Sequence, residues 1–96
     1  MLTGKQKRYL RSLAAGMSAV LQVGKSGISD NLVKQLDETL TARELVKARV
    51  LSNCLLDVSE AASALCERTG AELVQQIGRN VILYRRGEDA EILLPE

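Results

Sequence analysis

Apolar and basic residues alternate at helical spacing near the N-terminus. Thr3 is placed to cap a helix, and Gly16 is placed to end it in the left-handed conformation that glycine adopts without a Cβ penalty. The inward stripe of this helix consists of Leu2, Gln6, Leu10, Leu13 and Ala14. The basic residues that occupy much of the remaining turn are Lys5, Lys7, Arg8 and Arg11. The pattern predicts a basic amphipathic helix.

A short apolar run follows at residues 19–23, with the partly β-branched character of a strand buried in a sheet that helices cover. A loop with two glycines, residues 24–27, leads to Ser29, whose hydroxyl is placed to cap a second helix. The apolar residues of that helix, spaced three and four apart, are Leu32, Val33, Leu36 and Leu40. We expect this helix to bury one face and to end near Arg43.

The next two elements are a strand and a third helix. Residues 44–51 alternate as a half-buried strand does, with Lys47 and Arg49 facing outward. The third helix has apolar residues at helical spacing, and Gly70 is placed to end it; the apolar residues are Ala61, Ala62, Leu65 and Cys66. Either Asp57 or Ser59 is placed to cap this helix.

Two more strands are predicted near the C-terminus. Residues 73–77 and 81–86 flank a turn signal at 78–80, which favours a β-hairpin. Residues 92–95 form a short apolar run and are a candidate edge segment.

The resulting element order is α-β-α-β-α-β-β. Strands separated by helices imply right-handed crossovers and parallel pairing, whereas the final hairpin is antiparallel. A chain of 96 residues has the common size of one domain. We therefore predict a single α/β domain over residues 1–96, with a mixed four-stranded sheet packed with helices.

The composition excludes several classes of function. Because the chain has no His, it holds neither a His-based triad nor a Cys/His zinc site. With two Tyr and neither Phe nor Trp, it has little means of stacking RNA bases on aromatic rings. Cys54 and Cys66 lack metal-ligand spacing, so we expect them to be reduced and to lie in or beside the core. No metal and no cofactor is expected.

Hydropathy and charge indicate where the protein acts and what it contacts. No apolar run approaches the roughly 20 residues of a membrane span, and the first residues lack the apolar region of a signal peptide. We therefore expect a cytoplasmic protein that does not bind membranes. Residues 1–49 contain nine Lys or Arg and four Asp or Glu, whereas residues 50–96 contain four and eight. This polarity predicts a basic face and an acidic face.

The loop Gly24-Lys25-Ser26-Gly27 is the candidate binding feature. Between a strand and a helix start, such a loop presents backbone N–H groups and a positive charge to an anion. It is not a Walker loop, because Ala19 stands where that motif has a glycine, and Gln22 breaks the dinucleotide pattern. The loop therefore favours binding of an RNA phosphate over nucleotide hydrolysis. The alternative is that its glycines serve backbone geometry alone.

Four segments in a fixed order resemble a known family. They are residues 5–14 (KQKRYLRSLA), 20–29 (VLQVGKSGIS), 44–49 (ELVKAR) and 76–85 (QIGRNVILYR). Together they resemble the CRM domain family, the chloroplast RNA splicing and ribosome maturation domain. The chain is similar to the stand-alone bacterial form of that domain, the YhbY-like RNA-binding proteins.

The resemblance implies an RNA-binding protein associated with ribosomal RNA in precursors of the large ribosomal subunit. It also implies a fold like the C-terminal domain of bacterial translation initiation factor three. The RNA-binding residues that it suggests are Lys5, Lys7, Arg8, Arg11, Gly24, Lys25, Ser26, Gly27 and Arg85. Glu96 stands where the family often has a basic residue, which argues against RNA binding by the C-terminal tail.

Two other classes of function are alternatives to RNA binding. A protein-interaction module would contact a ribosomal protein or an assembly factor through the acidic C-terminal half or through the sheet. An enzyme would need catalytic groups, and the candidate carboxylates Asp57, Glu60 and Glu67 are more simply explained as helix caps and solvated charges. We therefore expect no catalytic residue and no small-molecule substrate.

Overall fold

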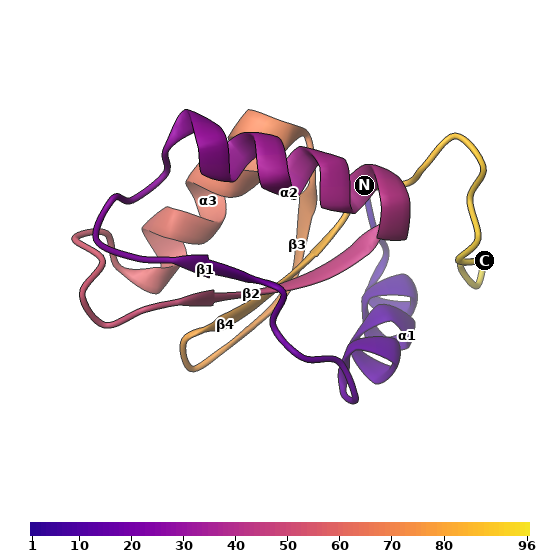
Figure 1. Cartoon of the computed structure of the whole chain (residues 1–96). Helices are drawn as coiled ribbons and strands as arrows, with labels where there is room; N and C mark the ends of the chain where they lie inside the picture. The colour runs from indigo at the N-terminus through magenta and orange to yellow at the C-terminus, as the bar shows by residue number, and fades with distance from the viewer.

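The computed structural model describes residues 1–96 and contains three helices and four strands in the predicted order (Figure 1). The elements are α1 (Gly4–Ala14), β1 (Leu21–Val23), α2 (Asp30–Arg43), β2 (Leu45–Val50), α3 (Val58–Thr69), β3 (Glu72–Ile77) and β4 (Asn80–Tyr84). None of the helices has the length and apolar character that a membrane span requires.

The four strands form one mixed sheet in the order β1-β2-β4-β3. β1 pairs in parallel with β2, and β4 is antiparallel to both β2 and β3. The predicted hairpin is confirmed, and its turn contains Gly78 with a φ of +56°. The expectation of parallel pairing holds for β1 and β2. It is wrong for β2 and β3, because β4 turns back and lies between them.

Local capping explains where the helices begin. Thr3 caps α1 and Asp57 caps α3, each in a reciprocal capping box, and Ser29 caps α2. α3 ends as predicted, with Gly70 in the left-handed conformation. The expectation that Gly16 ends α1 in the left-handed conformation is wrong. The φ of Gly16 is not positive, and the C-cap of α1 is Ala15 in the right-handed helical conformation.

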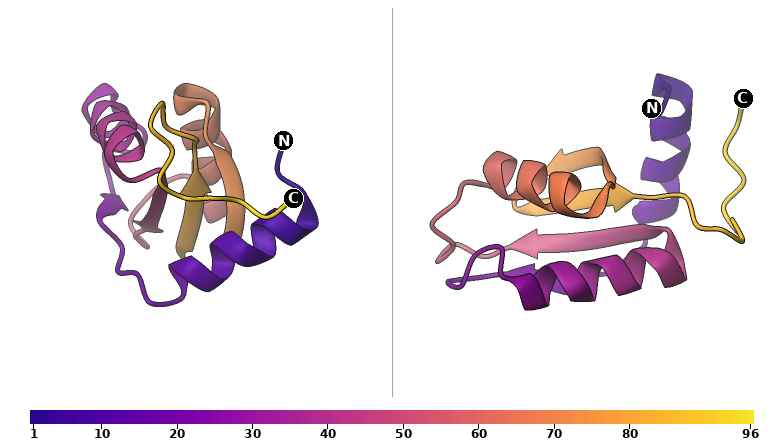
Figure 2. Two further views of the ribbon diagram at one scale, coloured as in Figure 1. Left: turned by 90° about the vertical axis from the view of Figure 1, so that its right-hand side faces the viewer. Right: turned by 90° about the horizontal axis from the view of Figure 1, so that it is seen from above.

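The helices cover opposite faces of the sheet (Figure 2). The larger cluster of buried residues lies between the sheet and the pair α2 and α3, and it includes Leu36, Leu40 and Leu65. The smaller cluster lies on the other face, beneath α1. Its buried members are Leu10, Ala14, Leu45, Val74, Ile82 and Tyr84. The sheet is therefore the middle layer of three.

The predicted strand at residues 19–23 is shorter and less buried than expected. Only Leu21–Val23 form β1, which is an edge strand, and Val20 is 43% exposed. In β2, Arg49 faces outward as predicted, but Lys47 is half-buried and its Nζ donates to the carbonyl of Met17 at 3.1 Å. The chain between α1 and β1 is thereby fixed to the sheet.

The C-terminal residues form no edge strand, contrary to the expectation for residues 92–95. Ile92 and Leu94 pack against the cluster beneath α1. The Gln6 side-chain amide donates to the carbonyl of Pro95 at 3.1 Å. This tail, residues 86–96, therefore runs along α1 and does not extend the sheet (Figure 2).

Candidate nucleic-acid interface

The glycine loop connects the end of β1 to the start of α2. The Gly27 N–H donates to the carbonyl of Gly24 at 2.9 Å, which closes a tight turn. At the helix start, the Leu32 N–H donates to Oγ of Ser29 at 3.1 Å. The loop therefore presents Lys25 beside the positive end of the α2 dipole.

The two glycines of the loop differ in backbone conformation. Gly27 has a φ of +65°, a conformation that other residues rarely adopt. Gly24 has no such φ, and a Cβ there would make ordinary contacts with Leu51 and Asn53, at 3.5 and 3.7 Å. Backbone geometry thus accounts for Gly27 but not for Gly24.

A shallow polar hollow surrounds the loop. All but one of its lining residues are polar or glycine, and they include Gln22 and Gln35 along with the loop itself. The Lys25 side chain is exposed and has neither a hydrogen bond nor an ion pair within the protein. The nearby acid Asp30, in the first turn of α2, forms an ion pair with Arg68 of α3 at 2.8 Å. The loop cation is therefore available to an external anion.

The predicted cations of α1 are also free of internal partners. Lys5, Arg8 and Arg11 are exposed and Lys7 is half-buried. No ion pair in the structure involves α1, and the helix itself contains no acid. This helix therefore presents uncompensated positive charge.

α1 and the glycine loop are not neighbours in space. α1 crosses the sheet face opposite α2 near the start of β1, and the loop follows the end of that strand (Figures 1 and 2). The structure thus places the predicted residues at two separate positive sites, with sheet surface between them.

Arg85 lies apart from both sites, just after β4. Its guanidinium forms an ion pair with Asp37 of α2 and donates to Oγ of Thr41 at 2.9 Å and to the carbonyl of Thr69 at 2.8 Å. The side chain is only 24% exposed. Arg85 therefore joins the ends of α2, α3 and β4, and a role for it in RNA binding stays a prediction.

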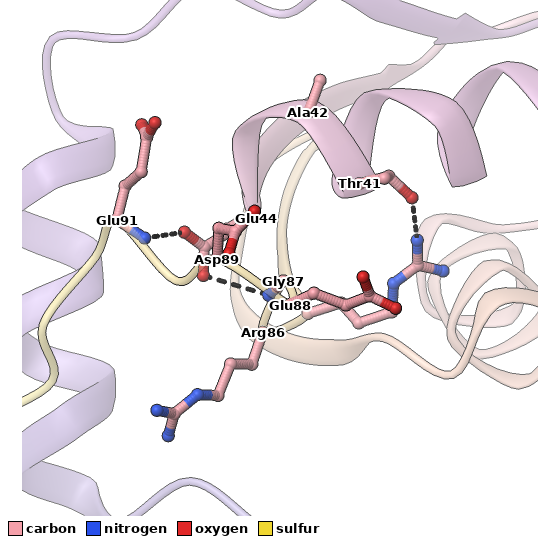
Figure 3. Close-up of a pocket in the computed structure, with 9 residues that line it drawn as sticks. Thr41, Ala42, Glu44, Arg86, Gly87, Glu88, Asp89 and Glu91 are labelled. Atoms are coloured by element: carbon pink, nitrogen blue, oxygen red, sulfur yellow. Dashed lines mark hydrogen bonds between the residues drawn. The ribbon is translucent and has the colours of Figure 1, made fainter.

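Glu44 has a structural role that the sequence pattern did not reveal (Figure 3). The alternating pattern places it in a strand, but it follows α2 with a φ of +66° and is 4% exposed. Its carboxylate accepts hydrogen bonds from the N–H groups of Gly87, Glu91 and Ile92, at 3.1, 2.6 and 3.2 Å. No local signal could have indicated this role, because its partners are more than 40 residues away.

These contacts determine the protonation of Glu44. Burial alone would raise the pKa of this carboxyl, but the three backbone N–H groups and the charge of Arg86 together hold the pKa below its ordinary value of 4.5. Glu44 is therefore an ionised anchor for the first half of the tail.

The cysteines are free and half-buried beside the larger core cluster, as predicted. Burial, with a smaller contribution from the charge of Glu72, raises the pKa of the Cys66 thiol. A raised pKa lowers the thiolate fraction and hence the reactivity of that residue.

The chain is similar to known proteins over nearly its full length. The family model described as the CRS1 / YhbY (CRM) domain matches residues 2–85. The Bacillus subtilis protein named "Probable RNA-binding protein YqeI" is 49% identical over 96 residues, covering 99% of this chain and all of the relative. A Haemophilus influenzae protein named "RNA-binding protein" is 32% identical, covering 98% of this chain and 95% of the relative.

A solved structure supports the fold. The solution structure of the hypothetical protein SAV1595 from Staphylococcus aureus superposes with a TM-score of 0.83 at 53% sequence identity. It covers 99% of this chain and 100% of the solved one.

Proposed function

Because the chain belongs to the CRS1 / YhbY (CRM) domain family, we propose that it is a non-enzymatic, cytoplasmic RNA-binding protein. We further propose that residues 1–96 act as a single binding domain. Its ligand is structured ribosomal RNA, and its role is to assist assembly of the large ribosomal subunit. Two relatives over nearly the full length carry names that describe RNA-binding proteins, which supports an RNA ligand.

The observation that carries this proposal is the set of cations without internal partners. The protein forms three ion pairs, and none involves α1 or the glycine loop. The proposed contact residues are Lys5, Lys7, Arg8, Arg11, Gly24, Lys25, Ser26 and Gly27. A polyanion can neutralise these charges without first breaking bonds inside the protein.

The loop binds a phosphate by combining three kinds of group. Backbone N–H groups at the start of α2 point toward the ligand, and the helix dipole favours negative charge there. The Lys25 ammonium and the Ser26 hydroxyl donate to phosphate oxygens, and the absence of a side chain at Gly24 lets the RNA backbone approach. A Gly-x-x-Gly loop clamps the RNA backbone in KH domains in a comparable way.

This interface provides affinity more than sequence discrimination. Tyr9 of α1 is 38% exposed, but Tyr84 is only 5% exposed and cannot stack on a base. Phosphate contacts position RNA and carry no direct sequence information. We therefore expect binding that weakens with salt, with a slope of roughly −0.7 to −0.9 per phosphate neutralised.

Charge reversal tests the proposed interface. Lys25→Asp, and separately Lys7→Glu with Arg8→Glu, should each lower the affinity for ribosomal RNA about tenfold or more, equivalent to roughly 1.4 kcal/mol per factor of ten. The salt slope should become shallower by about 0.7 to 0.9 for each phosphate that the variant no longer neutralises. Filter binding at several salt concentrations measures both quantities, and cosedimentation with ribosomal precursors tests the assembly role.

Arg43→Glu is the matched control, because Arg43 is exposed at the far end of α2 from the loop. This variant has the same change in net charge as Lys25→Asp and should bind RNA nearly as the wild type does. If the Lys25 and Lys7/Arg8 variants fold and bind RNA with unchanged affinity, the proposed surface is wrong. If the wild type binds ribosomal proteins but not naked RNA, the protein-interaction alternative replaces it.

A further inference from the structure

A row of four side chains crosses the sheet near the glycine loop. The strand register places Gln22 of β1 opposite Arg49 of β2, and Arg49 opposite Asn80 of β4. Asn80 is also opposite Ile77 of β3. Neighbouring strands are about 4.8 Å apart, so this cross-sheet row spans roughly 14 Å.

The cross-sheet row lies on the face that α1 partly covers. Along β4, Ile82 packs in the cluster beneath α1. Since alternate residues of a strand share a face, Asn80 and its partners Arg49 and Gln22 lie on that same side. The row nevertheless stays accessible: Gln22 and Arg49 are exposed, Asn80 is half-buried, and Ile77 is 55% exposed. α1 covers the other end of this face (Figure 2).

Two cations of α1 face the row. Gln6 marks the flank of α1 that contacts the tail, through its bond to Pro95. Lys7 and Arg11, one turn apart, lie about 100° to 140° further around the helix and share the other flank. Because α1 lies between the tail and the row, this second flank borders the open sheet surface.

The surface between α1 and the loop contains no carboxylate. Glu72 is the only acid in the four strands, and it lies at the far end of β3. There its carboxylate accepts a hydrogen bond from the Leu2 N–H at 2.8 Å. The Arg49 guanidinium, by contrast, has neither an ion pair nor a hydrogen bond within the protein. Gln22 also lines the hollow around the loop, so the row and the hollow share this residue at the edge of the sheet.

From this arrangement we propose that the cross-sheet row binds the ribose 2′-hydroxyls and base edges of unpaired RNA nucleotides. The inference rests on the proposed function, in which the loop and α1 hold the phosphates. The side-chain amides of Gln22 and Asn80 both donate and accept, as base edges and 2′-hydroxyls require. Arg49 adds five donors, and Ile77 offers an apolar surface to a base or ribose. The row thereby distinguishes RNA from DNA and one base from another, which phosphate contacts alone do not do.

Removing the amides without changing charge separates this role from phosphate binding. The probe is an RNA hairpin with a loop of about eight unpaired nucleotides, compared with the same hairpin carrying a 2′-deoxy loop. The variant Gln22→Ala with Asn80→Ala should bind the all-RNA hairpin roughly 5- to 20-fold more weakly, with an unchanged salt slope. Its preference for the ribose loop over the deoxy loop should fall toward one. Affinity is measured by fluorescence anisotropy.

Gln76→Ala is the matched control. Gln76 is an exposed amide of the same sheet, but it pairs with Val81 and bonds to Ser59 of α3, so it lies on the opposite face. This variant should keep both the affinity and the ribose preference. Gln22→Ala alone is a second test, because Gln22 is exposed on an edge strand where truncation leaves the core unchanged.

The outcomes distinguish this inference from the proposed function. One outcome is that Lys25→Asp weakens binding while Gln22→Ala and the double variant Gln22→Ala with Asn80→Ala keep the wild-type affinity and ribose preference. In that case the row is not a binding surface and the proposed function stands. If the wild-type protein binds neither hairpin, or binds without salt dependence, both fail. Weaker binding with a lost ribose preference supports the row.

Discussion

Two pairs of charged side chains, one at each end of the sheet, have opposite environments. At the closed end, where β2 begins and β4 finishes, Glu44 and Arg85 are largely buried and hydrogen-bonded to backbone and side-chain partners. At the open end, where β1 and β2 finish, Lys25 and Arg49 are exposed and have no internal partner. Arg79 is the exception at that end, because its Nε donates to the carbonyl of Val50 at 2.7 Å.

The comparison shows that residue type does not by itself identify a binding residue. Arg85 lies just after the end of β4, and Arg49 lies near the end of β2. The first stabilises the packing of two helices, and the second has a free guanidinium. A charge that has partners in the folded state contributes to stability, and a charge without partners is available to a ligand.

Glu44→Gln tests the closed end and has the largest expected effect. The substitution removes the charge that three N–H groups bind and places an amide donor among them. We expect the free energy of unfolding to fall by about 2 to 3 kcal/mol, because hydrogen bonds to a buried charged group contribute about 1.5 to 3 kcal/mol. Urea unfolding at pH 7 measures the loss.

The pH dependence of that loss is its internal control. Because the pKa of Glu44 is lower in the folded protein than its ordinary 4.5, its contribution is complete above about pH 4.5 and is lost as the pH falls through the folded-state value. The difference in stability between wild type and Glu44→Gln should therefore shrink below about pH 4.5. A difference that stays constant down to about pH 3 would contradict the anchoring role of the carboxylate.

Arg85→Met tests whether the arginine of the closed end is structural. It keeps the length of the side chain but leaves Asp37 and the Thr69 carbonyl without this donor. We expect a loss of about 1 to 2 kcal/mol in the free energy of unfolding, since Asp37 is partly solvated. Arg49→Met, by contrast, should weaken RNA binding and leave stability within about 0.5 kcal/mol of the wild type. A strong loss of RNA affinity in Arg85→Met would place Arg85 in the interface.

Tyr84→Phe has the smallest expected effect. It tests the unpaired buried hydroxyl at the closed end of the sheet. The Tyr84 hydroxyl is buried and has no hydrogen-bond partner, and burial raises the pKa of this phenol. Removing an unpaired buried hydroxyl should leave stability unchanged or raise it by less than about 1 kcal/mol. Thermal unfolding followed by circular dichroism measures the change. A clear destabilisation would show that the hydroxyl has a partner after all.

Much of the architecture could be predicted from the sequence because its signals are local. The caps Thr3 and Ser29, the terminating Gly70 and the turn at Gly78 each act within a few residues, and the structure confirms them. The apolar spacing of α2 predicted its buried face for the same reason, since periodicity needs no knowledge of the partner. The likeness to the C-terminal domain of translation initiation factor three stays a prediction.

The candidate site was predicted only in part. The free cations of α1 and the loop were identifiable from the sequence, because runs without acids indicate uncompensated charge. The cross-sheet row was not, since Gln22, Arg49 and Asn80 lie on three strands and meet only through the register. The sequence pattern wrongly placed Glu44 in a strand, and it left the role of Arg85 open. The partners of both residues are up to 48 residues away in the chain.

The sequence by itself determined the order of the helices and strands, the N-terminal caps of α1 and α2 and most of the apolar stripes that form the core, because these depend on short-range spacing and backbone preference. The tertiary structure alone decided that β4 lies between β2 and β3, on which face each polar strand residue emerges, and which charges find partners. Those outcomes depend on contacts between residues far apart in the chain. Of two arginines that look alike in the sequence, Arg85 therefore has internal partners and Arg49 has none.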